Sequence, residues 1–129
     1  MIQTGILNPS INSLLSRVRH TNTLVIADRG FPHWPNVETV DISLVSGVPR
    51  VADVIMAIRA NFKIGKVYQA EEFLTANPEE VRLTYERALS DLNVIHEPHV
   101  QLKARVPQAI GIIRTGDAAR FGNLILESA

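Results

Sequence analysis

An uninterrupted apolar run over residues 24–27 constrains the fold of this chain more than any other feature. Polar residues bound the run on both sides, a pattern typical of a strand whose two faces are both covered. Before it, Asn8 and Pro9 supply a helix start signal, and the apolar residues that follow share one helical face. A helix over 9–19 that leads into a strand over 21–27 predicts a layered α/β fold.

The rest of the chain alternates in the same way, without a linker, an internal repeat or a low-complexity segment. Apolar runs indicate strands, and apolar residues at helical spacing after a start signal indicate helices. One domain over 1–129 is predicted, in which helices and a mostly parallel central sheet form three α/β/α layers. Further strands are expected over 40–42, 66–69, 93–96, 110–113 and 124–126, and further helices from about 46–49, from 77–78 to 89–92, and over 100–104.

The composition narrows the class of partner. Thirteen basic and thirteen acidic residues leave a formal net charge of +0, so no surface for nucleic acid or for an anionic membrane is expected. The chain has no cysteine, which excludes disulfides, thiolate catalysis and thiolate-bound metal. Neither a secretory segment nor an apolar run long enough to span a membrane is present. We therefore expect a cytoplasmic protein whose partners are small molecules or proteins.

Two polar residues at the ends of the first helix-to-strand unit are candidates for chemistry. Asp28 directly follows the strand, and the carboxyl ends of strands in open α/β sheets border ligand crevices. His20 closes the helical part, and histidine side chains exchange protons near neutral pH. The simpler interpretation of each is structural, because an imidazolium can interact with a helix C-terminus and a carboxylate can cap a turn. Together, the pair predicts one site that holds both groups.

Metal and nucleotide chemistry have weaker support in the sequence. His96 and His99 flank Pro98 without a zinc-binding motif around them, so no metal site is expected. The loop over 114–117 contains a glycine but matches no phosphate-binding pattern. We therefore expect neither a metal nor an organic cofactor.

Six short segments become specific when they are taken together. They are GILN (5–8), HTNTLVIAD (20–28), DI (41–42), GVP (47–49), IRTGD (113–117) and FGNLIL (121–126). In this combination the chain resembles the D-ribose pyranase and L-fucose mutarotase family. The resemblance covers essentially the whole sequence and implies that family's three-layer fold.

The resemblance also implies roles for individual residues. His20 corresponds to the family's proton donor, and Asp28 corresponds to a sugar-binding carboxylate. A further sugar contact, counted back from the family's aromatic residue, falls on His99, where the ribose type has histidine and the fucose type has arginine. The family usually has tyrosine at the aromatic position, and this chain has phenylalanine there. The other sugar contacts implied by the resemblance are Phe121, Gly122 and Asn123.

The implied activity is that of an isomerase which opens and recloses a sugar ring by acid–base catalysis, without metal or cofactor. His99 favours D-ribose pyranase, whereas the 115–120 loop looks closer to the fucose branch, so L-fucose mutarotase is the alternative within the family. A non-catalytic sugar-binding module is the alternative from another class, although such a module has no need of His20. The resemblance further implies a homodecamer of two stacked pentameric rings, with sites between neighbouring subunits.

Overall fold

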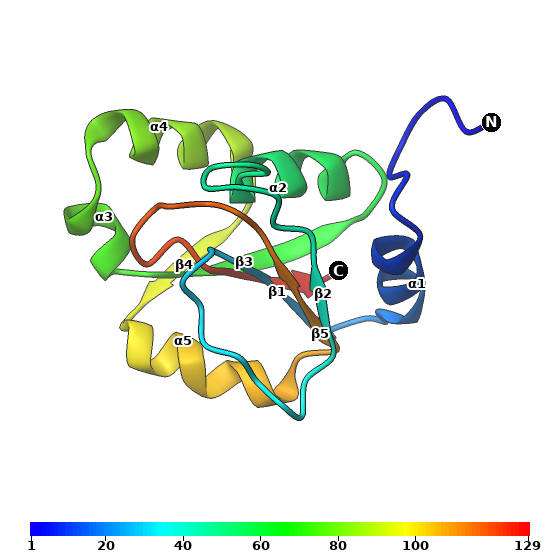
Figure 1. Ribbon diagram of the computed structural model, residues 1–129. Helices are drawn as coiled ribbons and strands as arrows, with labels where there is room; N and C mark the ends of the chain where they lie inside the picture. The colour runs from blue at the N-terminus through cyan, green and yellow to red at the C-terminus, as the bar shows by residue number, and fades with distance from the viewer.

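Six strands form one mixed sheet at the centre of the computed structural model, which describes residues 1–129 (Figure 1). The strands are β1 (Thr23–Ala27), β2 (Thr39–Asp41), β3 (Ile64–Ala70), β4 (Val94–Glu97), β5 (Gly111–Arg114) and β6 (Leu124–Ser128). Their order across the sheet is β2-β5-β1-β6-β3-β4. Because β6 is antiparallel to both of its neighbours and the other pairs are parallel, β6 alone points against the other five strands. The prediction of a mostly parallel sheet is confirmed.

Helices cover both faces of this sheet, as Figure 1 shows for α2 and α4 on one side and α5 on the other. The helices are α1 (Pro9–Arg17), α2 (Val51–Arg59), α3 (Glu72–Ala76), α4 (Glu79–Ala88) and α5 (His99–Arg105), and a 3-10 turn over Val106–Gln108 follows α5. The first four helices share one apolar cluster with Leu24 and Leu126 of the sheet. On the opposite face, Leu102 of α5 lies in a second cluster with Val25 and Ile125. These two clusters confirm the predicted three-layer α/β/α domain.

The starts of α1 and α2 differ in how near in the sequence their hydrogen-bond partners lie. Asn8 caps α1 as predicted, because its Oδ1 accepts a 3.0 Å hydrogen bond from the backbone N–H of Ile11. The helix ends at Arg17 and not at residue 19. The expectation that α2 starts within 46–49 is wrong, since it begins at Val51. A carboxylate distant in the sequence accounts for this start: Asp117 Oδ2 accepts a 2.9 Å hydrogen bond from the backbone N–H of Val51.

All the expected strands are present, with ends that differ by only one or two residues. The expected helices at 77–92 and 100–104 correspond to α4 and α5. The short helix α3 was not expected, because five residues are too few to show a helical period. None of the helices combines the length and the apolar character that crossing a membrane requires.

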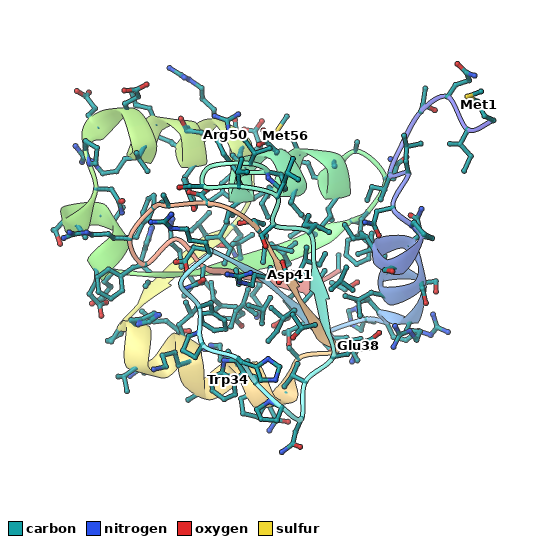
Figure 2. The ribbon with its side chains drawn as sticks, viewed as in Figure 1. Met1, Trp34, Glu38, Asp41, Arg50 and Met56 are labelled. Atoms are coloured by element: carbon teal, nitrogen blue, oxygen red, sulfur yellow. The ribbon has the colours of Figure 1, made fainter.

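The five strands that point the same way end at one edge of the sheet, which we call the carboxyl edge. Two long loops lie there, over 28–38 after β1 and over 115–123 between β5 and β6. The first of them carries Trp34 to the face that α5 covers (Figure 2), where its ring stacks on Phe31 at a centroid distance of 6.2 Å. This is the edge at which open α/β sheets hold their ligands.

Candidate active site

A cavity of about 480 Å³ opens at the carboxyl edge. Its wall comes from three segments far apart in the sequence, namely the loop after β1, the start of α5 and the loop between β5 and β6. The volume lies within the range of small-molecule sites. Four of the six residues expected at the site line the cavity, and these are Asp28, His99, Phe121 and Asn123.

Asp28 holds its carboxylate at the floor of this pocket, with only 7% of the residue exposed. Its Oδ1 accepts a 3.0 Å hydrogen bond from the backbone N–H of Gly30, and its Oδ2 accepts one of 3.1 Å from Gly122. Gly122, which is also among the expected residues, thus contacts Asp28 through its backbone N–H. Burial raises the pKa of Asp28, while the two N–H donors lower it and Asp117 nearby adds to the rise.

Asn123 links the two long loops beneath the pocket. Its Oδ1 accepts a 2.8 Å hydrogen bond from the backbone N–H of Asp28, and the residue is 3% exposed. Its amide nitrogen makes no hydrogen bond within the chain. The arrangement fixes the orientation of the amide and leaves an N–H donor beside a carboxylate acceptor, a combination suited to sugar hydroxyls.

His99 occupies the first position of α5, opposite Asp28. Its backbone N–H lies 3.0 and 3.1 Å from the two carboxylate oxygens of Glu72, which fixes the start of the helix. Its ring meets the ring of Phe121 edge-on, with 5.0 Å between centroids, and its Nε2 has no partner in the chain. Burial lowers the pKa of the His99 imidazole, with Glu72 and Asp28 acting against the shift and Lys103 adding to it.

The sequence did not single out every residue of the pocket wall. Arg29, Asp117 and Arg120 also line it, so the wall carries charges of both signs. Asp117 is 8% exposed and ties the loop together, because its Oδ1 accepts a 2.9 Å hydrogen bond from the backbone N–H of Ala119. In the sequence, Asp117 belongs to the IRTGD segment over 113–117, but its own place just after a strand is shared by many ordinary turn residues.

His20 lies elsewhere. It is exposed and precedes β1, whereas Asp28 follows β1, so the two residues stand at opposite edges of the sheet. The five residues of the strand alone span roughly 16 Å. Within one chain, therefore, the predicted pairing of His20 with Asp28 in one pocket does not occur. The prediction overlooked that a strand carries its two ends apart.

His96 and Glu97, which lie just before His99 in the chain, make contacts with residues outside the pocket wall. His96 Nε2 lies 3.0 Å from Gln69 Oε1, and Glu97 forms a bidentate ion pair with Arg105 at 2.6 and 3.0 Å. No three histidine, aspartate or glutamate side chains come together in a group that could hold a metal ion.

Fold and pocket define the class, which is a small three-layer α/β protein with a polar small-molecule pocket at the carboxyl edge. The chain belongs to the RbsD / FucU transport protein family, whose model matches residues 1–129. This match confirms the family resemblance seen in the sequence.

Proteins of known name align with almost the full length of this chain. The chain is 34% identical to a D-ribose pyranase of Lactobacillus acidophilus, with 99% of this chain and 97% of that protein aligned. It is 38% identical to a D-ribose pyranase of Geobacillus kaustophilus, with 99% and 93% aligned. Among solved structures, Bacillus subtilis RbsD complexed with D-ribose superposes with a TM-score of 0.91 at 30% identity, covering 100% of this chain and 98% of that one. A fucose mutarotase of Streptococcus pneumoniae in complex with L-fucose shares the fold, with a TM-score of 0.78 at 16% identity over 95% and 93% of the two chains.

Proposed function

We propose that this protein is a D-ribose pyranase, an isomerase that interconverts the pyranose and furanose forms of ribose and their anomers. The observation that carries the proposal is the full-length likeness to the ribose complex of RbsD, at a TM-score of 0.91 and 30% identity. The pocket at the carboxyl edge is consistent with it, since it offers an acceptor, a donor and an apolar ring to one small polar molecule.

The reaction needs only proton transfers. In ring opening, the anomeric hydroxyl loses its proton, the bond between the anomeric carbon and the ring oxygen breaks, and the ring oxygen gains a proton. Attack of a different hydroxyl on the new carbonyl closes a ring of the other size, and attack on the other carbonyl face gives the other anomer. A positioned acid or base accelerates such steps by a factor of roughly 10² to 10⁴.

In this proposal, each pocket residue makes a different contact with the sugar. The Asp28 carboxylate accepts hydrogen bonds from sugar hydroxyls, and the free amide N–H of Asn123 donates one. His99, whose buried Nε2 has no partner within the chain, lines the same cavity, and the ring of Phe121 supplies an apolar surface. Because hydrogen bonds already fix Asp28 and Asn123, the sugar meets an arrangement that needs little reorganisation.

The proton donor, His20, comes from a neighbouring copy in this proposal. His20 is exposed at the edge of the sheet opposite the pocket, so a head-to-tail contact between copies brings one chain's His20 to the next chain's pocket. Repeated contacts of this kind close into a ring, and we propose two stacked pentameric rings. Exposed apolar residues at the carboxyl edge are available for such a contact, and they are Leu44, Val45, Val48 and Val100. We also propose that the protein acts in the cytoplasm, as expected from the sequence.

Saturation-transfer NMR of ribose tests the activity. The wild-type protein is expected to accelerate exchange between ribopyranose and ribofuranose, and His20→Ala is expected to abolish the acceleration while the fold survives, since His20 is exposed and packs in neither core. Circular dichroism and thermal melting check the fold of the variant. A folded His20→Ala protein that exchanges ribose at the wild-type rate would show that His20 is not the proton donor.

L-Fucose mutarotase is the second candidate. The 115–120 loop, which looks closer to the fucose branch of the family, favours it, and four of its residues line the pocket next to the sugar contacts. The ribose and fucose activities are compared directly by the same NMR measurement.

A further inference from the structure

Phe121 stands in a strained backbone conformation. Its φ is +52°, in the left-handed region that glycine adopts readily and phenylalanine rarely does. A conformation of this kind persists only where surrounding contacts hold it. The contacts that do so lie on the residues directly before and after Phe121.

Asn77, just after α3, holds the residue before Phe121. Its Nδ2 donates a 2.7 Å hydrogen bond to the carbonyl of Arg120, and its Oδ1 accepts a 3.0 Å hydrogen bond from the Arg120 N–H. The same Nδ2 lies 3.0 Å from the carbonyl of Phe73 within α3. One side-chain amide thus fixes both backbone groups of Arg120 to the end of a helix.

Tyr85 of α4 holds the residue after Phe121. Its hydroxyl donates to the carbonyl of Gly122 at 3.0 Å and lies 3.2 Å from Asp117 Oδ2. The approach is close enough that a Cβ on Gly122 would stand 2.5 Å from the Tyr85 oxygen. Tyr85 itself is 3% exposed and packs against Phe73 at 4.4 Å between ring centroids, so its hydroxyl has a fixed position.

We infer that Asn77 and Tyr85 act together as positioning residues that hold Phe121 against His99 and aim the Gly122 N–H at the Asp28 carboxylate. Neither residue lines the pocket, and both act through the backbone of the loop that does. For the reaction, the inference rests on the proposed ribose pyranase activity. Its structural part, the position of the Phe121 ring beside His99, can be measured without any sugar.

Three variants separate this role from a general loss of stability. Tyr85→Phe removes only the hydroxyl, and Asn77→Ala removes the amide. Tyr68→Phe is the matched control, because the Tyr68 hydroxyl bonds Glu127 Oε2 at 3.1 Å and Tyr68 does not line the pocket. Thermal melting confirms that each variant is folded before the other measurements.

The first measurement is the proton NMR spectrum of the histidine rings without sugar, with the His99 signals identified by their loss in His99→Gln. The edge-on Phe121 ring shifts those signals. In Tyr85→Phe and Asn77→Ala, which we call the clamp variants, the signals are expected to move toward the values of a free histidine. Tyr68→Phe leaves them in place. Unchanged His99 signals in both clamp variants, or an equal change in Tyr68→Phe, would overturn the inference.

The second measurement is ribose exchange. Loss of positioning weakens sugar contacts made before and during the reaction alike, so KM is expected to rise by about threefold to tenfold in the clamp variants while kcat stays near the wild-type value. A fall in kcat at unchanged KM would contradict a positioning role. If the wild-type protein exchanges no ribose, the proposed function fails, and the sugar-free His99 signals still decide the inference.

Discussion

Burial moves the pKa values of the two titratable residues on the pocket floor in opposite directions. It raises the pKa of Asp28 from 3.8 and lowers that of His99 from 6.5. Both shifts favour the uncharged form, because a charge in this pocket loses water. Asp28 keeps two backbone N–H donors that favour its carboxylate, whereas the His99 ring has an unpartnered Nε2. A neutral imidazole is the form that suits a hydroxyl partner as donor or acceptor.

The pH dependence of ribose binding follows from the lowered pKa of His99. Affinity measured by calorimetry is expected to be highest at mildly alkaline pH and to fall as the pH passes through the lowered pKa, with a midpoint below 6.5. The neutral form of His99 likewise favours folding above pH 6.5, and this contribution is lost as the pH falls through the lowered pKa, because the unfolded chain binds the proton more tightly.

His99→Gln is the control for that pH dependence. This variant removes the histidine titration and leaves that of Asp28, whose pKa burial raises. The difference between the two profiles therefore belongs to His99. A wild-type midpoint at or above pH 6.5 would contradict the lowered pKa.

At the scale of elements, the sequence predicted most of the framework and only part of the site. The apolar runs of β1 and β5 are unmistakable because burial on both faces demands them. The reversed direction of β6 has no counterpart in the sequence, since direction depends on the path of the loop over 115–123. The sequence predicted a helix that starts at 77–78 and runs to 89–92, and it did not single out Asn77 or Tyr85 for a contact with the loop. Their contacts with the loop arise from packing between distant segments, which local patterns do not encode.

The loop between β5 and β6 is anchored to α2 by one carboxylate, and this anchor can be tested. Asp117→Ala removes two hydrogen bonds to backbone N–H groups, at Val51 and Ala119. We expect urea unfolding followed by circular dichroism to show a loss of about 1.5–3 kcal/mol in the free energy of unfolding, the range for a buried hydrogen bond to a charged group.

Glu38→Ala serves as the comparison for Asp117→Ala. Glu38 pairs with Arg17 on the surface, with each side chain 47% exposed, and an exposed pair of this kind contributes little to stability. Equal effects of the two substitutions would show that Asp117 does not anchor the loop.

At the scale of the whole molecule, the separation of His20 from the pocket is the main consequence of the fold. One chain holds the proposed proton donor at one edge of the sheet and the proposed sugar contacts at the other. The separation was present in the sequence, because the two residues flank one strand and a strand carries its ends apart, whereas the predicted pairing considered residue types alone. In the proposed ring, the separation of His20 from the pocket has a function, because each contact between copies brings one chain's His20 to the next chain's pocket.

Mixed assemblies test that arrangement. His20→Ala and Asp28→Asn are each expected to lose most of the ribose exchange when expressed alone. Coexpressed, they are expected to recover about one quarter of the wild-type activity, because a random mixture places an intact His20 beside an intact Asp28 of the next chain at about one contact in four. Light scattering should give a mass ten times that of the 14.3 kDa chain. Activity no higher than the mean of the two separate variants would contradict a site shared between chains.

The proposed D-ribose pyranase activity is tested most directly by saturation-transfer NMR on the wild-type protein, with D-ribose and L-fucose measured side by side under the same conditions. We predict that the protein accelerates exchange between ribopyranose and ribofuranose more than it accelerates exchange between the fucose anomers, because a histidine stands at position 99 and lines the pocket. Faster fucose than ribose exchange, or no acceleration of either sugar, would contradict the assignment.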